Sequence, residues 1–75
     1  MIIETRISQY RFAEMDEDTE STLKQCCKNF ARDMRYDMEF EYYSVYWEKE
    51  NWLLAKLAMP EIEYYLKEHN GSPNK

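Results

Sequence analysis

Residues Phe40 to Ala58 read F-E-Y-Y-S-V-Y-W-E-K-E-N-W-L-L-A-K-L-A, and this segment holds six of the twelve aromatic side chains of the chain. Its first part, residues 40–47, is almost entirely aromatic or β-branched, a composition that suits a pleated, half-buried strand. The polar run from Glu48 to Asn51 indicates a turn, because asparagine tolerates the left-handed backbone that turns often need. The sequence therefore predicts a β-hairpin with strands at residues 40–47 and 52–59, around which the other segments would pack.

Both faces of this predicted hairpin carry apolar side chains. Successive side chains of a strand point to opposite sides, so Tyr43 and Val45 share one face while Phe40 shares the other with two tyrosines. In a single small domain, helices readily cover only one of the two faces. We expect aromatic residues on the uncovered face to anchor a partner, and the strand register decides which tryptophan is exposed. The candidate anchors are Tyr42, Tyr46, Trp47 and Trp52.

The flanking segments predict one more strand and two helices. Residues 2–12 read as a strand, with a bulge or an early end near Ser8. A helix from about Asp18 to Arg35 is indicated by apolar residues at i, i+3, i+4, i+7, i+8 and i+11. Those positions are Leu23, Cys26, Cys27, Phe30, Ala31 and Met34. Pro60 suits the first position of a second helix that ends near His69.

The predicted order is strand, helix, strand, strand, helix, which describes a small two-layer α+β domain. It implies a three-stranded mixed sheet with both helices on one face. The first two strands would run parallel through a right-handed crossover, and the last two antiparallel. We expect a single domain over residues 1–71, with Asn70-Gly71 as a helix C-cap and residues 72–75 as a flexible tail.

Length and charge limit the classes of function. A chain of 75 residues makes one domain with a small core, and its net charge of −5 argues against a simple binder of phosphate backbones. No apolar run approaches the roughly 20 residues of a membrane span, and no secretory signal is visible at the start. Two adjacent cysteines, Cys26 and Cys27, lack the spacing of a zinc site and are expected to fill a seam between helix and sheet. Unpaired cysteines fit a reducing compartment, so we expect a cytoplasmic protein.

Residues that could carry catalysis are few. The acidic run from Asp16 to Glu20 begins like a calcium loop, but Ser21 stands where that loop needs glycine and Cys27 where it needs glutamate. His69 is the only histidine, and it has no nucleophile in a recognisable motif beside it. A single glycine excludes the familiar phosphate-cradling loops. The sequence predicts a protein that is not an enzyme and has no cofactor or metal.

Two charge patterns point to different partners. A basic flank of the first helix could follow the backbone of a single-stranded nucleic acid whose bases stack on the sheet tyrosines, although a solvated helix face explains it more simply. That flank consists of Lys24, Lys28, Arg32 and Arg35. The carboxylates suit another reading, in which negative charge steers the domain toward a basic protein and the aromatic residues hold it there. The acidic candidates near the hairpin are Glu39, Glu41, Glu48 and Glu50.

The pattern is therefore typical of a small acidic domain that works by protein–protein contact. Proteins of this size and charge are often inhibitors or decoys of nucleic-acid-handling proteins, including DNA-mimicking proteins of phages that block host defence nucleases. That comparison concerns a class of proteins, and no family motif supports it. The alternatives are a homodimeric structural or regulatory domain that associates through the same open face, and a binder of single-stranded nucleic acid.

Overall fold

The computed structural model describes residues 1–69, so the expected C-cap at Asn70-Gly71 and the expected tail at 72–75 lie outside the described residues. This part of the chain forms four strands and four helices. In order they are β1 (Ile2–Ser8), α1 (Gln9–Glu14), α2 (Glu17–Phe30), β2 (Asp33–Asp37), β3 (Tyr42–Glu48), α3 (Lys49–Ala58), α4 (Ile62–Tyr65) and β4 (Lys67–Glu68).

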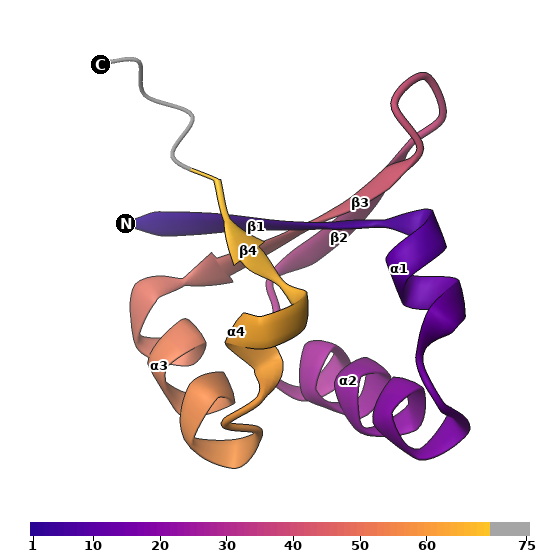
Figure 1. Cartoon of the computed structure of the whole chain (residues 1–75). Coiled ribbons are helices and arrows are strands. Elements are labelled where there is room, and N and C mark those ends of the chain that lie inside the picture. Colours follow the sequence, from indigo (N-terminus) through magenta and orange to yellow (C-terminus); the bar gives the residue numbers. More distant parts are fainter. Residues whose placement is uncertain (70–75) are drawn as a thin grey trace.

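The strands form one sheet in the order β2-β3-β1-β4, and every neighbouring pair is antiparallel. All four helices lie on the same side of this sheet (Figure 1). The prediction of a small α+β domain is confirmed. Its details differ, because the sheet has a fourth strand and no parallel pair, and the predicted right-handed crossover is therefore wrong.

The hairpin exists but lies earlier in the sequence than predicted. It joins β2 to β3 through a turn at residues 38–41, and β2 comes from residues that the helical pattern had assigned to the end of the first helix. The helix ends at Phe30 because the next residues bond to the sheet instead, starting with the Arg32 backbone N–H, which donates to the Tyr46 carbonyl at 2.7 Å.

The predicted second strand of the hairpin is the helix α3. Alternation of Leu53, Ala55, Leu57 and Met59 suggests a strand, yet the same segment also places apolar residues at the helical spacing i, i+3 and i+7. The helical spacing applies in the fold, because Trp52, Ala55 and Met59 recur on one face and are all buried. Leucine, alanine and lysine are also strong helix formers, which favours the helix over the strand.

The centre of the core is a pair of tryptophans. The rings of Trp47 on β3 and Trp52 on α3 lie 5.0 Å apart, and α2 packs beside them with Leu23, Cys26 and Cys27. Each buried indole N–H has a partner. Trp47 Nε1 donates to Thr5 Oγ1 at 3.0 Å, and Trp52 Nε1 donates to Glu68 Oε2 at 3.3 Å. Both rings are therefore buried without an unsatisfied donor.

Of the two outcomes that the sequence leaves open near Ser8, the early end of the first strand is confirmed, whereas most of the helix predicted after Pro60 is not formed. The first strand stops at Ser8, whose hydroxyl accepts from the Arg11 backbone N–H and so caps α1. Of the helix predicted from Pro60 to His69, only the single turn α4 is formed. Lys67 and Glu68, which the sequence pattern places in that helix, form β4 beside β1, and the His69 N–H donates to the Glu4 carbonyl at 2.8 Å. His69 thus lies at a strand end and not at a helix C-terminus.

Candidate protein-interaction surface

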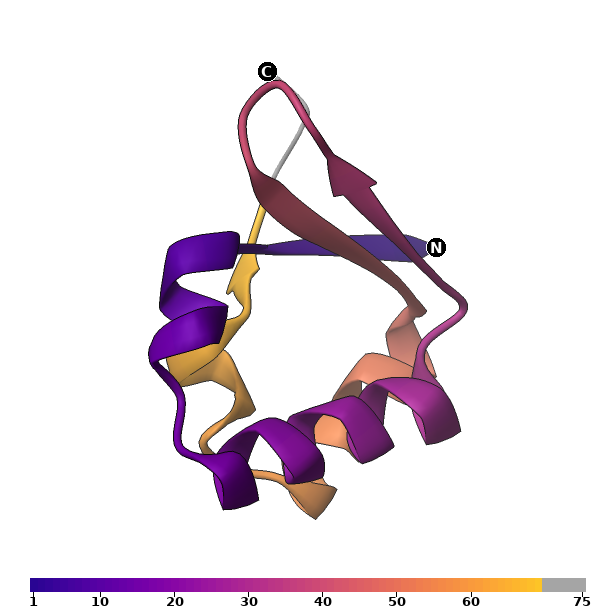
Figure 2. The ribbon, with the colours of Figure 1, turned by 90° about the vertical axis from the view of Figure 1, so that its right-hand side faces the viewer.

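The side of the sheet that faces away from the helices is uncovered within the described chain, and we call it the open face (Figure 2). Strand alternation and register decide which side chains point there. From β1 these are Ile2, Glu4, Arg6 and Ser8, from β2 Asp33, Arg35 and Asp37, and from β3 Tyr42, Ser44, Tyr46 and Glu48. The expectation that Tyr42 and Tyr46 share a face opposite Tyr43 and Val45 agrees with this register.

Arginine side chains cover the two tyrosines of the open face. The Arg6 guanidinium lies 4.6 Å from the centre of the Tyr42 ring, and that of Arg35 lies 5.7 Å from the Tyr46 ring. Both arginines are also held by carboxylates, Arg6 by Glu4 at 2.8 Å and Arg35 by an aspartate of its own strand at 3.1 Å. The open face is consequently a mixed-charge surface with half-buried rings, not an apolar patch.

The most exposed large apolar side chains next to the open face lie in the β2–β3 turn. Residues 37–41, D-M-E-F-E, form what we call the hairpin tip, which projects beyond the rest of the molecule (Figures 1 and 2). Met38 is 82% exposed and Phe40 is 68% exposed. The Phe40 ring lies 6.4 Å from that of Tyr42 and nearly parallel to it, so the tip continues into the open face.

The tip is held in one conformation despite its exposure. The Asp37 carboxylate accepts from the backbone N–H groups of Glu39 and Phe40, each at 2.9 Å. Glu41 takes a φ of 59°, in the left-handed region that costs a residue with a side chain roughly 1–2 kcal/mol. Hydrogen bonds at both ends of Glu41 hold it there, since its N–H donates to the Asp37 carbonyl and its carbonyl accepts from the Gln9 N–H.

The Glu41 side chain is turned toward α1. The Tyr10 hydroxyl donates to Glu41 Oε1 at 2.9 Å, and this hydrogen bond to a carboxylate raises the pKa of the Tyr10 phenol. Glu39 remains exposed at the tip, whereas Glu48 and Glu50 lie at the other end of β3, where Glu48 pairs with Arg32. The four glutamates that the sequence grouped therefore occupy two separate regions.

The two tryptophans do not belong to any exposed surface. Trp47 is 0% exposed and Trp52 is 2% exposed, so the expectation that either of them anchors a partner is wrong. Trp47 shares its face of β3 with Val45, the face that the helices cover, and Trp52 lies on the inner side of α3. Both anchors that do lie toward solvent, Tyr42 and Tyr46, come from the opposite face of β3.

The predicted basic flank divides between two places. Lys24, Lys28 and Arg32 line an open hollow of about 430 Å³ between α2 and β2, together with Met34. Arg35 points to the open face, on the other side of the sheet. Arg32 also lines a smaller hollow of about 240 Å³ together with Arg35 and Tyr46. The four cations therefore do not lie along one flank of a helix, as predicted, but are divided between the two sides of the sheet.

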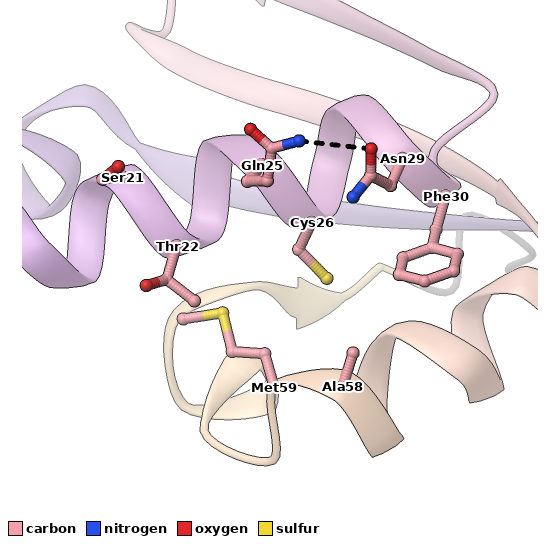
Figure 3. Close-up of a pocket in the computed structure, with 8 residues that line it drawn as sticks. All are labelled: Ser21, Thr22, Gln25, Cys26, Asn29, Phe30, Ala58 and Met59. Carbon is pink, nitrogen blue, oxygen red and sulfur yellow. Dashed lines mark hydrogen bonds between the residues drawn. The ribbon is translucent and has the colours of Figure 1, made fainter.

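Another hollow, of about 360 Å³, lies between α2 and the end of α3 (Figure 3). Its lining is neutral, and the Gln25 side chain donates to that of Asn29 at 3.3 Å. The Cys26 thiol points into the seam and lies 3.8 Å from the Ala55 carbonyl. Burial raises the pKa of Cys26, and it raises that of Cys27 to about 12, so both thiols stay protonated at neutral pH. The expectation that these cysteines fill a packing seam agrees with their burial.

Met38 and Phe40 are not among the contact residues that the sequence predicts. The pattern places Phe40 in the hairpin strand and Met38 in no element. A signal for their exposure is present in the sequence. An aspartate often starts a turn by accepting from the backbone N–H groups two and three residues further along, as Asp37 does from Glu39 and Phe40. Apolar residues inside such a turn cannot reach the core and must project.

Within residues 1–69, no group of three or more histidine, cysteine, aspartate or glutamate side chains is placed to hold a metal ion. No helix in the same part of the chain has both the length and the apolar character needed to cross a membrane. No family model matches the sequence, and neither a curated protein nor a solved structure matches it.

Proposed function

We propose that this chain is a non-enzymatic protein–protein interaction domain that binds a basic protein with its hairpin tip and the adjoining part of the open face. The observation that carries the proposal is the exposure of Met38 and Phe40 on a tip whose backbone is fixed by hydrogen bonds. Exposed apolar side chains of this size are uncommon on a surface without a binding role when they project together.

The tip has the physical properties of a binding anchor. Aromatic residues and methionine are enriched at the centres of protein interfaces, and a preformed loop loses little conformational entropy on binding. Acidic residues alternate with the two apolar residues along the tip, and Glu39 between them is exposed. Negative charge around an apolar centre favours a partner that presents cations around an apolar or aromatic pocket.

A protein that handles nucleic acid has such a site. It combines lysine and arginine side chains for phosphates with aromatic surfaces on which bases stack. The tip offers carboxylates in place of phosphates and the Phe40 ring in place of a base. We therefore propose that the domain acts as an inhibitor or decoy of such a protein, by occupying the place of the nucleic acid.

The test compares capture by three forms of the protein immobilised as bait. Wild type is set beside the tip variant Met38→Ala/Phe40→Ala and a control, Leu53→Ala/Leu57→Ala, which removes two exposed leucines of α3. After cross-linking in a cell extract, bound proteins are identified by mass spectrometry. We expect a basic nucleic-acid-binding protein to be captured by wild type and control and not by the tip variant, and we expect single-stranded DNA added before the cross-linking to prevent its capture. Identical capture by all three forms would refute the proposal.

A further inference from the structure

A groove along the free edge of β2 is a second surface, and the proposed function does not use it. Two open hollows of about 430 and 680 Å³ lie between this strand and the helices and share Lys24 and Met34 in their linings. Phe12 and Tyr43 contribute apolar surface to the larger hollow, and Cys27 and Ala31 line the smaller. We call this the edge groove. Its volumes lie within the roughly 300–1,000 Å³ that bound groups usually occupy.

Basic side chains line the smaller hollow. Lys24, Lys28 and Arg32 stand around it, with Asp33 as the one acidic residue. Lys24 pairs with Glu20 at 2.8 Å and Arg32 pairs with Glu48, but Lys28 has no carboxylate within 4 Å in the part of the chain that is described. The groove therefore has an apolar floor and a rim of mixed charge, since Glu20 and Asp33 also line it, and Lys28 is its one cation without a carboxylate partner in the described residues.

The hairpin tip is the complement of this groove. Its sequence alternates acidic and apolar residues, and Met38, Glu39 and Phe40 are exposed. In one molecule the tip points away from α2, so it cannot reach its own groove (Figures 1 and 2). We infer that the occupant of the edge groove is the hairpin tip of a second copy, and that the protein forms a reciprocal dimer.

The edge position of β2 makes this arrangement possible. β2 is the first strand in the order β2-β3-β1-β4, so its outer edge is free to pair. Met34 lies between the two hollows and is 44% exposed, so the groove is accessible from this edge.

This inference goes beyond the proposed function and does not rest on it. A dimer of this kind would cover the tip, so self-association and binding of a basic partner would compete. The charge of −5 on each copy opposes association over long distances, yet at about 150 mM salt the repulsion is screened beyond roughly 8 Å and the local pairing dominates.

Purified protein and a charge swap test the inference without any partner. Lys28→Glu reverses the rim of the groove, and Glu39→Lys reverses the tip; both side chains are exposed, so both variants should fold. By sedimentation velocity at about 150 mM salt we expect wild type to dimerise and each variant alone to associate at least ~10-fold more weakly. An equimolar mixture of the two variants should recover dimerisation, because reversed tip then meets reversed groove.

The control is Lys49→Glu, the same charge change on α3, which should dimerise like wild type. Wild type that stays monomeric up to about 1 mM overturns the inference. A dimer that both variants leave unchanged, or that their mixture does not restore, also overturns it, because the contact would then use another surface. Neither result affects the capture experiment on the proposed function, since a monomer can still bind a partner with its tip.

Discussion

Strand β3 carries two sets of aromatic side chains with opposite environments. Trp47 points toward the helices and is fully buried, with its indole N–H donated to Thr5. Tyr42 and Tyr46, on the other side of the same strand, are half-buried under arginine side chains. An uncovered sheet face can therefore keep its aromatic residues and still be a charged surface. The tip next to this face, in contrast, leaves Met38 and Phe40 mostly uncovered.

The largest expected effect comes from the buried side. Trp47→Ala removes a fully buried ring from the pair with Trp52, and such truncations cost about 3–5 kcal/mol. This is a large part of the stability of a domain of this size, which is of order 4–11 kcal/mol by the usual value per residue. Urea denaturation followed by far-UV circular dichroism measures the loss.

Tyr46→Ala is the matched change on the open face of the same strand. Its ring is only half-buried, so we expect a loss of about 1 kcal/mol or less. Equal losses for the tyrosine and the tryptophan would contradict the difference between the two faces.

The sequence was most informative where one physical signal acted alone. The helix α2 has apolar residues at helical spacing and the cap Asp16, and its predicted start near Asp18 lies within two residues of the observed one. The segment 49–58 fits both a strand and a helix, and packing against the sheet decides between them. Residues 33–37 form an edge strand with charged residues on its open side, which a hydrophobic pattern does not reveal.

The candidate site was predictable in part for the same reason. Alternation along β3 correctly separated Tyr42 and Tyr46 from the residues around Val45, because strand periodicity is independent of the partner strand. Whether the tryptophans are exposed depends on the position of the hairpin turn, which the sequence pattern places at residues 48–51. Once the turn moved to residues 38–41, Trp52 became part of a helix and Phe40 became part of the tip.

The second largest effect is expected at Thr5, which connects the buried ring to the sheet. Its hydroxyl accepts from Trp47 Nε1 and donates to the Val45 carbonyl at 3.2 Å. Thr5→Val keeps the shape but leaves a buried donor without an acceptor, at a cost of about 1–3 kcal/mol. Thr5→Ser retains the hydroxyl and should lose less. If valine is tolerated as well as serine in urea denaturation, the hydrogen bond does not explain the burial of Trp47.

A smaller and pH-dependent effect is expected at Asp16, which does at the start of α2 what Asp37 does in the tip. The Asp16 carboxylate accepts from the Thr19 N–H at 2.7 Å, and this bond lowers the pKa of Asp16. A lowered pKa means that the carboxylate stabilises the fold above the unfolded value, about 3.9, and loses that effect as the pH falls through the folded value.

Asp16→Asn keeps a capping oxygen and removes the charge, so it isolates the pH-dependent part. Wild type should exceed the asparagine variant in thermal stability at neutral pH, and the difference should shrink on acidification. A difference that stays constant from neutral pH to about pH 3 would contradict the pKa shift. Asp16→Ala, which removes the cap as well, should be the less stable of the two variants at neutral pH.

The smallest effect on stability is expected at the tip, and it gives the strongest contrast with the effect of changing the buried side chains. Met38→Ala/Phe40→Ala removes more apolar surface than Thr5→Val, but that surface is already exposed to water in the fold. The free energy of unfolding should change by no more than about 0.5 kcal/mol. Such a result, together with lost dimerisation or lost capture, means that the two side chains contribute to binding and not to folding. A loss of stability above about 1 kcal/mol would instead make them part of the packed domain, because side chains free in solvent have no contacts to lose.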